Sequence, residues 1–223
     1  MHLINIKALL ERDQLMSMGR QVDRRIKVLE LRDNETTNYM ILSHRWIDAE
    51  VDYEEMVGLA KVDNEERDEI RRCPGYKKIL DTCKQAKRDG YEWVWADTCC
   101  IDKRSSAELS EAINSMHRWY RNARVCYVYL HDVHHSSFPT ERNREKYPIL
   151  NGWPEWFLHG WTLQEMIAPS NVQFFNRDWR CIGNKTTLEH TLEDITGVPW
   201  HILKDGLHRK RLCVAQIIPW AAK

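Results

Sequence analysis

Four short apolar runs, rich in β-branched and aromatic residues, are spaced along this chain. Each run is bounded by polar or turn-forming residues, a pattern typical of a buried strand that ends in a loop. The predicted strands are Tyr39–Ser43, the apolar start of Tyr91–Asp102, Arg124–Val133 and Asn171–Trp179. Before them, an opening amphipathic helix and an alternating strand over Arg24–Asp33 are predicted.

Segments with a helical period separate these strands. Over Gly75–Gly90 one helical stripe holds Tyr76, Ile79, Leu80, Cys83 and Ala86. The next helix begins at a capping signal, Ser105 to Glu108, and its predicted apolar side consists of Leu109, Ile113, Met116 and Tyr120. Further helices are predicted over the charged stretch from Val62, from Trp156 to a stop at Pro169, and over Lys185–Thr196.

Strands that alternate with helices indicate an α/β fold with a mostly parallel sheet and helices on both faces. In such sheets, ligands bind outside the carboxyl ends of the strands. The polar stretches Ser43–Trp46 and Asp97–Lys103 follow two of the predicted strands directly. We therefore expect a ligand site at this edge of the sheet.

Charge and composition limit the classes of partner and binding site that the chain is expected to have. Lys plus Arg and Asp plus Glu both number 33, so the formal net charge is zero and a nucleic-acid partner is not expected. Ten tryptophans in 223 residues indicate an aromatic core, a ring-binding pocket, or both.

The sequence also indicates a cellular location. No apolar run is long enough to span a bilayer, and the N-terminus does not have the pattern of a secretory signal. Seven cysteines, an odd number without a CxxC pair, predict reduced thiols rather than a disulfide framework or a zinc site. We expect a cytoplasmic protein.

The stretch WFLHGWTLQEMIAPSN, Trp156 to Asn171, combines aromatic rings with one carboxylate. Glu165 follows Trp161 by one helical turn, so two interpretations are open. Glu165 is either a solvated residue of an ordinary packing helix, with Trp161 in the core, or a carboxylate that points into a pocket beside an aromatic ring.

Several long segments resemble the fungal heterokaryon-incompatibility (HET) domain. They are YMILSHRW, the stretch from Gly75 to Val133, and GWTLQEMIAPSNVQFFNRDW. The resemblance covers nearly all of residues 1–223, so we expect a single HET domain, the N-terminal module of a longer protein. One departure stands out, because His159 replaces the arginine that is usual in the family.

The resemblance implies a cell-death module of non-self recognition, often fused to nucleotide-binding receptors or repeat domains. The HET domain is in turn similar to the Toll/interleukin-1 receptor (TIR) domain, which has a flavodoxin-like α/β fold. Enzymatic TIR domains cleave NAD+ with a glutamate in a Trp-x-x-x-Glu helix, the pattern of Trp161 to Glu165 here. The implied activity is an NAD+ glycohydrolase that self-association switches on, with NAD+ as substrate and no cofactor.

A lone glutamate suits this chemistry, because nicotinamide leaves as a neutral base and the ribose carries the positive charge. Glu165 is therefore the predicted catalytic residue. Arg45 and Lys103 are candidates for the pyrophosphate, and aromatic rings for the base. The predicted substrate-binding residues are Ser43, His44, Arg45, Trp46, Asp97, Cys100, Asp102, Lys103 and Trp161.

Simpler interpretations remain open for several of these residues. Asp97 and Asp102 are also typical caps of a turn and a helix, and Cys100 of a buried, inert thiol. The histidines of HDVHH follow no known ligand pattern, so no metal is expected. The rival function is a non-catalytic signalling module that recruits partners by homotypic contacts.

Overall fold

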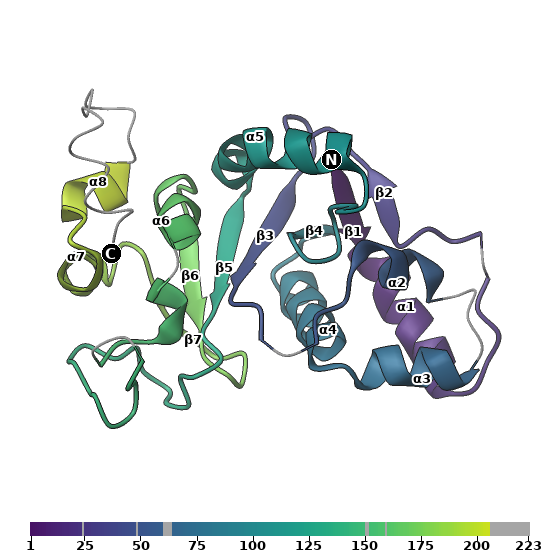
Figure 1. Ribbon diagram of the computed structural model, residues 1–223, viewed down its shortest axis with the longest axis horizontal. Coiled ribbons are helices and arrows are strands. Elements are labelled where there is room, and N and C mark those ends of the chain that lie inside the picture. The colour runs from purple at the N-terminus through teal and green to yellow at the C-terminus, as the bar shows by residue number, and fades with distance from the viewer. Residues whose placement is uncertain (24, 48, 60–63, 150–151, 159, 206–223) are drawn as a thin grey trace. The chain divides into compact units, whose positions relative to one another are not determined.

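The computed structural model describes residues 1–23, 25–47, 49–59, 64–149, 152–158 and 160–205 (Figure 1). The chain divides into two compact units. The first consists of Met1–Leu42 and Trp46–Met116, and the second of Ser43–Arg45 and the chain from His117 onward. Each unit contains strands and helices of its own.

The first unit has four strands in the order β2-β1-β4-β3. They are β1 (His2–Asn5), β2 (Leu29–Leu31), β3 (Tyr39–His44), whose last two residues belong to the second unit, and β4 (Trp93–Ala96). Strands β3 and β4 are parallel, with Tyr39 opposite Trp93, whereas β1 runs antiparallel to both β2 and β4.

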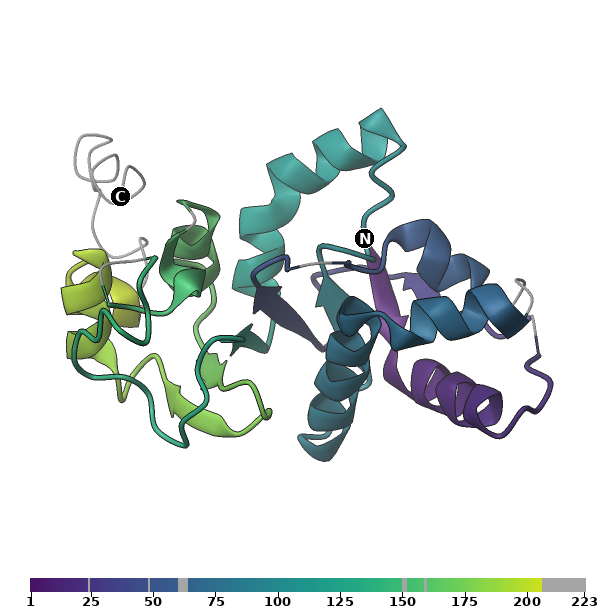
Figure 2. The same cartoon turned by 60° about the horizontal axis from the view of Figure 1, so that its bottom comes forward.

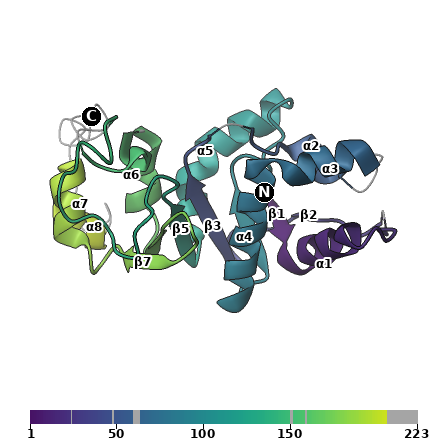
Figure 3. The same cartoon turned by 90° about the horizontal axis from the view of Figure 1, so that it is seen from below.

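Helices cover these strands on both sides. They are α1 (Ile6–Ser17), α2 (Tyr53–Gly58), α3 (Asn64–Arg72), α4 (Pro74–Arg88) and the first part of α5 (Ser106–Asn122). Figures 2 and 3 show α1 and α4 side by side on one side of the strands and α5 on the other.

The apolar stripe predicted for α4 is confirmed, because all five of its residues are buried. The stripe predicted for α5 is wrong in part, although Tyr120 is buried as predicted. Ile113 is 51% exposed, and the buried side carries Ala112, Ser115 and Trp119 instead. Small side chains at two of these positions let the helix backbone approach its neighbours closely, which the size of Ile113 would prevent.

The second unit contains three strands in the order β5-β6-β7. They are β5 (Val125–Tyr129), β6 (Val172–Phe175) and β7 (Cys181–Asn184). Strands β5 and β6 are parallel, with Cys126 opposite Val172, and β7 runs antiparallel to β6.

Four helical segments complete this unit: η1 (Glu155–Leu158), α6 (Gly160–Ile167), α7 (Glu189–Thr196) and α8 (Trp200–Asp205). Helix α6 contacts η1 and α8, and α8 packs on α7. Helix α7 ends at Gly197, which has a left-handed φ of 73° as a C-terminal cap.

The α/β fold class expected from the sequence is confirmed, and the sheet is mixed. Strands β1 and β7 and helices α2 and α8 were not predicted. The single helix expected from Trp156 to Pro169 is wrong in part, since Trp156 lies in η1 and Glu165 in α6. Gly160, which starts α6, is a poor residue for a continuous helix.

Two further expectations concern the thiols and the membrane. The cysteines that the structure describes are free thiols. Among the helices of the described ranges, none combines the length and the apolar character that crossing a bilayer requires.

Candidate functional site

A chain of hydrogen bonds in the second unit joins Ser43 to Glu165. Ser43, at the end of β3, is 1% exposed and donates its hydroxyl proton to Oε2 of Glu165 at 2.5 Å. The same Ser43 oxygen accepts a hydrogen bond from Nε1 of the buried Trp156 at 2.8 Å. The Glu165 carboxylate is therefore directed onto the end of β3 rather than into bulk water.

Local sequence explains why α6 turns Glu165 this way. The next two residues, Met166 and Ile167, are 1% and 5% exposed, so the last turn of the helix packs inward. Glu165 itself is partly buried. The predicted pocket residue Trp161 has a side chain outside the described residues, and so does the family departure at His159.

Two buried ionisable groups lie near the C-terminal end of α6, the helix that carries Glu165. Burial raises the pKa of the Cys126 thiol well above its usual value, and the Glu165 carboxylate raises it further. Burial also lowers the pKa of Lys185 to about 8. The Lys185 ammonium donates to the backbone oxygen of Met166 at 3.2 Å and to that of Pro169.

Arg45, a candidate for the pyrophosphate, makes an ion pair with Glu155 of η1. His131 lies 3.7 Å from the same carboxylate oxygen, and Asp132 accepts a hydrogen bond from the Glu155 amide at 2.8 Å. Burial raises the pKa of Asp132, while His131 opposes that shift. A phosphate that binds the Arg45 guanidinium would therefore have to replace the Glu155 carboxylate or bind beside it.

In the first unit, three predicted residues meet at the surface. Nε1 of Trp46 donates to Oδ2 of Asp97 at 2.9 Å, and the Lys103 ammonium lies 3.9 Å from the centre of the Trp46 ring. Lys103 also donates to the backbone oxygen of Thr98 at 3.3 Å. Trp46 is 51% exposed, so this cation–π pair presents an indole to solvent in a fixed orientation.

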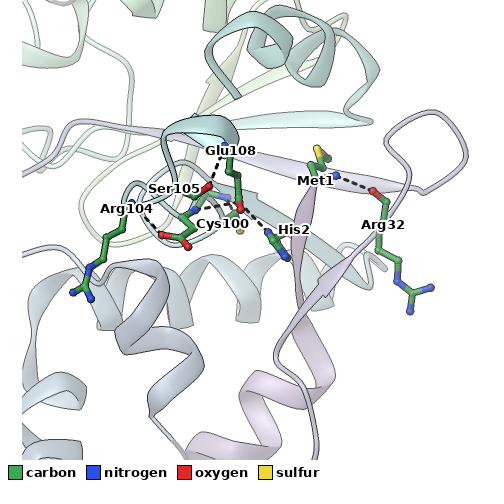
Figure 4. A network of polar contacts seen from close by, with 9 residues as sticks. Met1, His2, Arg32, Cys100, Arg104, Ser105 and Glu108 are labelled. Carbon is green, nitrogen blue, oxygen red and sulfur yellow. Dashed lines mark hydrogen bonds and ion pairs between the residues drawn. The ribbon is translucent and has the colours of Figure 1, made fainter. Parts of the chain in front are cut away.

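Asp102 and its neighbours form the cap of α5. Glu108 Oε1 accepts from the Asp102 amide and lies 3.1 Å from Nδ1 of His2, and Ser105 Oγ accepts from the Glu108 amide (Figure 4). The predicted capping signal is confirmed. The Asp102 carboxylate accepts from the Arg104 amide at 3.0 Å.

Two predicted residues are inside the protein. Cys100 is 2% exposed with its sulfur against the backbone of β4, and burial raises the pKa of its thiol well above the usual value. His44 is 8% exposed. Among the described residues, no group of three or more His, Cys, Asp and Glu side chains is arranged to hold a metal ion.

The structure thus places the predicted residues in separate groups. Ser43 and Glu165 meet in the second unit, and Trp46, Asp97 and Lys103 meet in the first. Sequence reasoning missed Trp156, which donates to Ser43, and Glu155, which pairs with Arg45. It also missed Lys185, which donates to the end of α6. Trp156 is the aromatic residue that begins the stretch Trp156–Asn171, so the sequence did point to it. Nothing in the sequence around Glu155 or Lys185 indicates a role for these two residues.

Ser43→Ala is expected to lower the free energy of unfolding by about 1–3 kcal/mol, because it leaves the buried indole N–H of Trp156 without an acceptor. Urea denaturation followed by circular dichroism measures the change. Ser137→Ala, in an exposed loop position, is the matched control. Equal midpoints for both variants would contradict the importance of this hydrogen bond.

A family model and one curated relative match this chain. The family model described as Heterokaryon incompatibility protein (HET) matches residues 39–152, which include Ser43–Trp46 and Asp97–Lys103 but end before Glu165. Vegetative incompatibility protein HET-E-1 of Podospora anserina is 44% identical over 172 residues, covering 74% of this chain. The chain spans only 12% of that relative's length. No solved structure matches the chain at a significant level.

Proposed function

The chain belongs to the heterokaryon incompatibility (HET) family, and we propose that it is a cell-death module of non-self recognition that cleaves NAD+. The similar protein HET-E-1 is named for vegetative incompatibility, which supports the biological role. In this proposal the domain is TIR-like, self-association activates it, and the longer protein carries further domains.

The observation that carries the enzymatic proposal is the fixed carboxylate of Glu165. Its hydrogen bond from Ser43, itself held by Trp156, limits the freedom of the side chain before any substrate arrives. A preorganised charge stabilises a developing cation without reorganisation during the reaction. A glutamate that served only solubility would not need a buried hydrogen-bond donor.

The reaction follows from that charge. The bond between C1′ of the ribose and the pyridinium nitrogen breaks, and its electron pair neutralises the nicotinamide. Positive charge develops on the ribose, where Glu165 stabilises it. A water oxygen then bonds to C1′ and releases a proton, which gives ADP-ribose. Attack by an adenine nitrogen in place of water would give a cyclic product.

Each unit also offers a contact of its own that suits one part of a dinucleotide. In the first unit, the exposed Trp46 ring, oriented by Asp97, is a separate surface on which an aromatic base can stack, and Lys103 brings positive charge to that surface. Arg45 offers a guanidinium to phosphate oxygens in exchange for Glu155. These contacts fit NAD+ and NADP+ alike.

The test is chromatography of NAD+ or NADP+ after incubation with concentrated protein, with and without a crowding agent. The expected result is release of nicotinamide together with ADP-ribose or a cyclic product, at a rate per molecule that rises with protein concentration. No release at high concentration and under crowding would overturn the proposal. The non-catalytic homotypic signalling module would then be the better interpretation.

A further inference from the structure

Lys185 is a buried lysine that the proposed reaction does not use. It follows the last residue of β7, its exposed fraction is 3%, and its backbone amide donates to the Val172 oxygen of β6 at 2.9 Å. Lys185 therefore belongs to a part of the chain that the strand pairing holds in place. A lysine rarely occupies such a position without a compensating contact.

The contact of Lys185 is the end of the helix that carries Glu165. Its ammonium donates to the oxygens of Met166, the residue after Glu165, and of Pro169. The last carbonyl groups of a helix have no partner within the helix. Pro169 cannot supply an amide proton to this end, so the lysine takes that place. The favourable location of a cation at a helix C-terminus adds to the contact.

We propose that Lys185 is a positioning residue, which fixes the carboxylate of Glu165 on Ser43 by tying the last turn of α6 to the β6–β7 pair. The connection runs from the backbone of β6 through Lys185 to the carbonyl oxygen of Met166, the residue after Glu165. The catalytic meaning of this role rests on the proposed function. The position of Glu165 itself can be measured without any turnover.

The groups around Lys185 agree with this role. Cys126 of β5 is its ionisable neighbour, and the same thiol also interacts with the Glu165 carboxylate of α6. Because burial raises the pKa of that thiol well above its usual value, Cys126 stays neutral and does not compete for the ammonium.

The indole N–H of Trp156 reports on the site, because its hydrogen bond ends on the Ser43 oxygen that contacts Glu165. Its resonance in a proton–nitrogen correlation spectrum is assigned by its loss in Trp156→Phe. Lys185→Met is expected to shift this resonance and to speed its hydrogen exchange at least about ten-fold. Glu165→Gln should shift the same resonance, and Lys146→Met, an exposed lysine of the second unit, should leave it unchanged.

If Lys185→Met does not fold, a pH titration of the wild-type protein still tests the proposal. In the wild-type protein, the Trp156 resonance should shift as the pH passes through about 8, where Lys185 loses its charge. Lys185→Arg keeps a cation, so this step should be absent. A flat wild-type profile from neutral to alkaline pH would overturn the proposal, as would a folded Lys185→Met with an unchanged Trp156 resonance.

Activity gives a separate readout. Where the wild type cleaves NAD+, Lys185→Met should lower kcat on the order of 10- to 100-fold with little change in KM, because misplacement of a catalytic group affects the transition state most. Where the wild type is inert, the shift of the Trp156 resonance still decides the positioning role. The two proposals therefore fail separately.

Discussion

Glu165→Gln is expected to slow the release of nicotinamide from NAD+ by about 10²–10³-fold while the protein stays folded. The amide has the size of the carboxylate and can still accept the Ser43 hydrogen bond, but it has no charge to place near the ribosyl cation. Loss of one preorganised electrostatic contact costs about 10²–10³-fold in kcat. Chromatography of the nucleotide products measures the loss, and circular dichroism checks the fold.

Glu111→Gln is the matched control, since Glu111 is an exposed glutamate of helix α5. It should keep the wild-type rate. If Glu165→Gln and Glu111→Gln cleave NAD+ equally fast, Glu165 is not the catalytic group, and the active site must be sought elsewhere, first around Trp46, Asp97 and Lys103.

The second large effect is a pH dependence of the free energy of unfolding that the titration of Lys185 causes. Burial lowers the pKa of Lys185 from 10.5 to about 8 in the folded protein. Between these two values the unfolded chain binds a proton that the folded protein does not, so this group makes stability rise with pH. Its contribution is fully present above 10.5 and is lost as the pH falls through about 8.

The difference between wild type and Lys185→Met isolates that contribution, because most other titrating groups cancel. Its slope is expected to approach 1.4 kcal/mol per pH unit within the window, about 3 kcal/mol in total. Urea denaturation of both proteins from pH 7 to pH 10.5 measures it. A difference that does not change with pH would show that Lys185 titrates as an ordinary surface lysine.

Local patterns account for what could be predicted of the fold. The strand from Tyr39 and the stripe of α4 follow from periodicity, because each residue's side of an element depends on its own near neighbours. Strand β7 was missed since its residues are only partly buried, and its pairing with β6 makes it a strand. The buried side of α5 was predicted wrongly at Ile113, because the packing there has room for the small Ala112 and not for the larger isoleucine.

By itself, the sequence determined the α/β alternation, the family resemblance, and the choice of Ser43 and Glu165 as polar residues next to apolar segments. Only the tertiary structure decided that these two residues, 122 positions apart, share a hydrogen bond, and that Glu155 holds Arg45. Contacts of this kind depend on how strands and helices pack, and no local period encodes them. The same holds for Lys185, whose burial at the end of α6 results from the turn after β7 and from a helix stopped by proline.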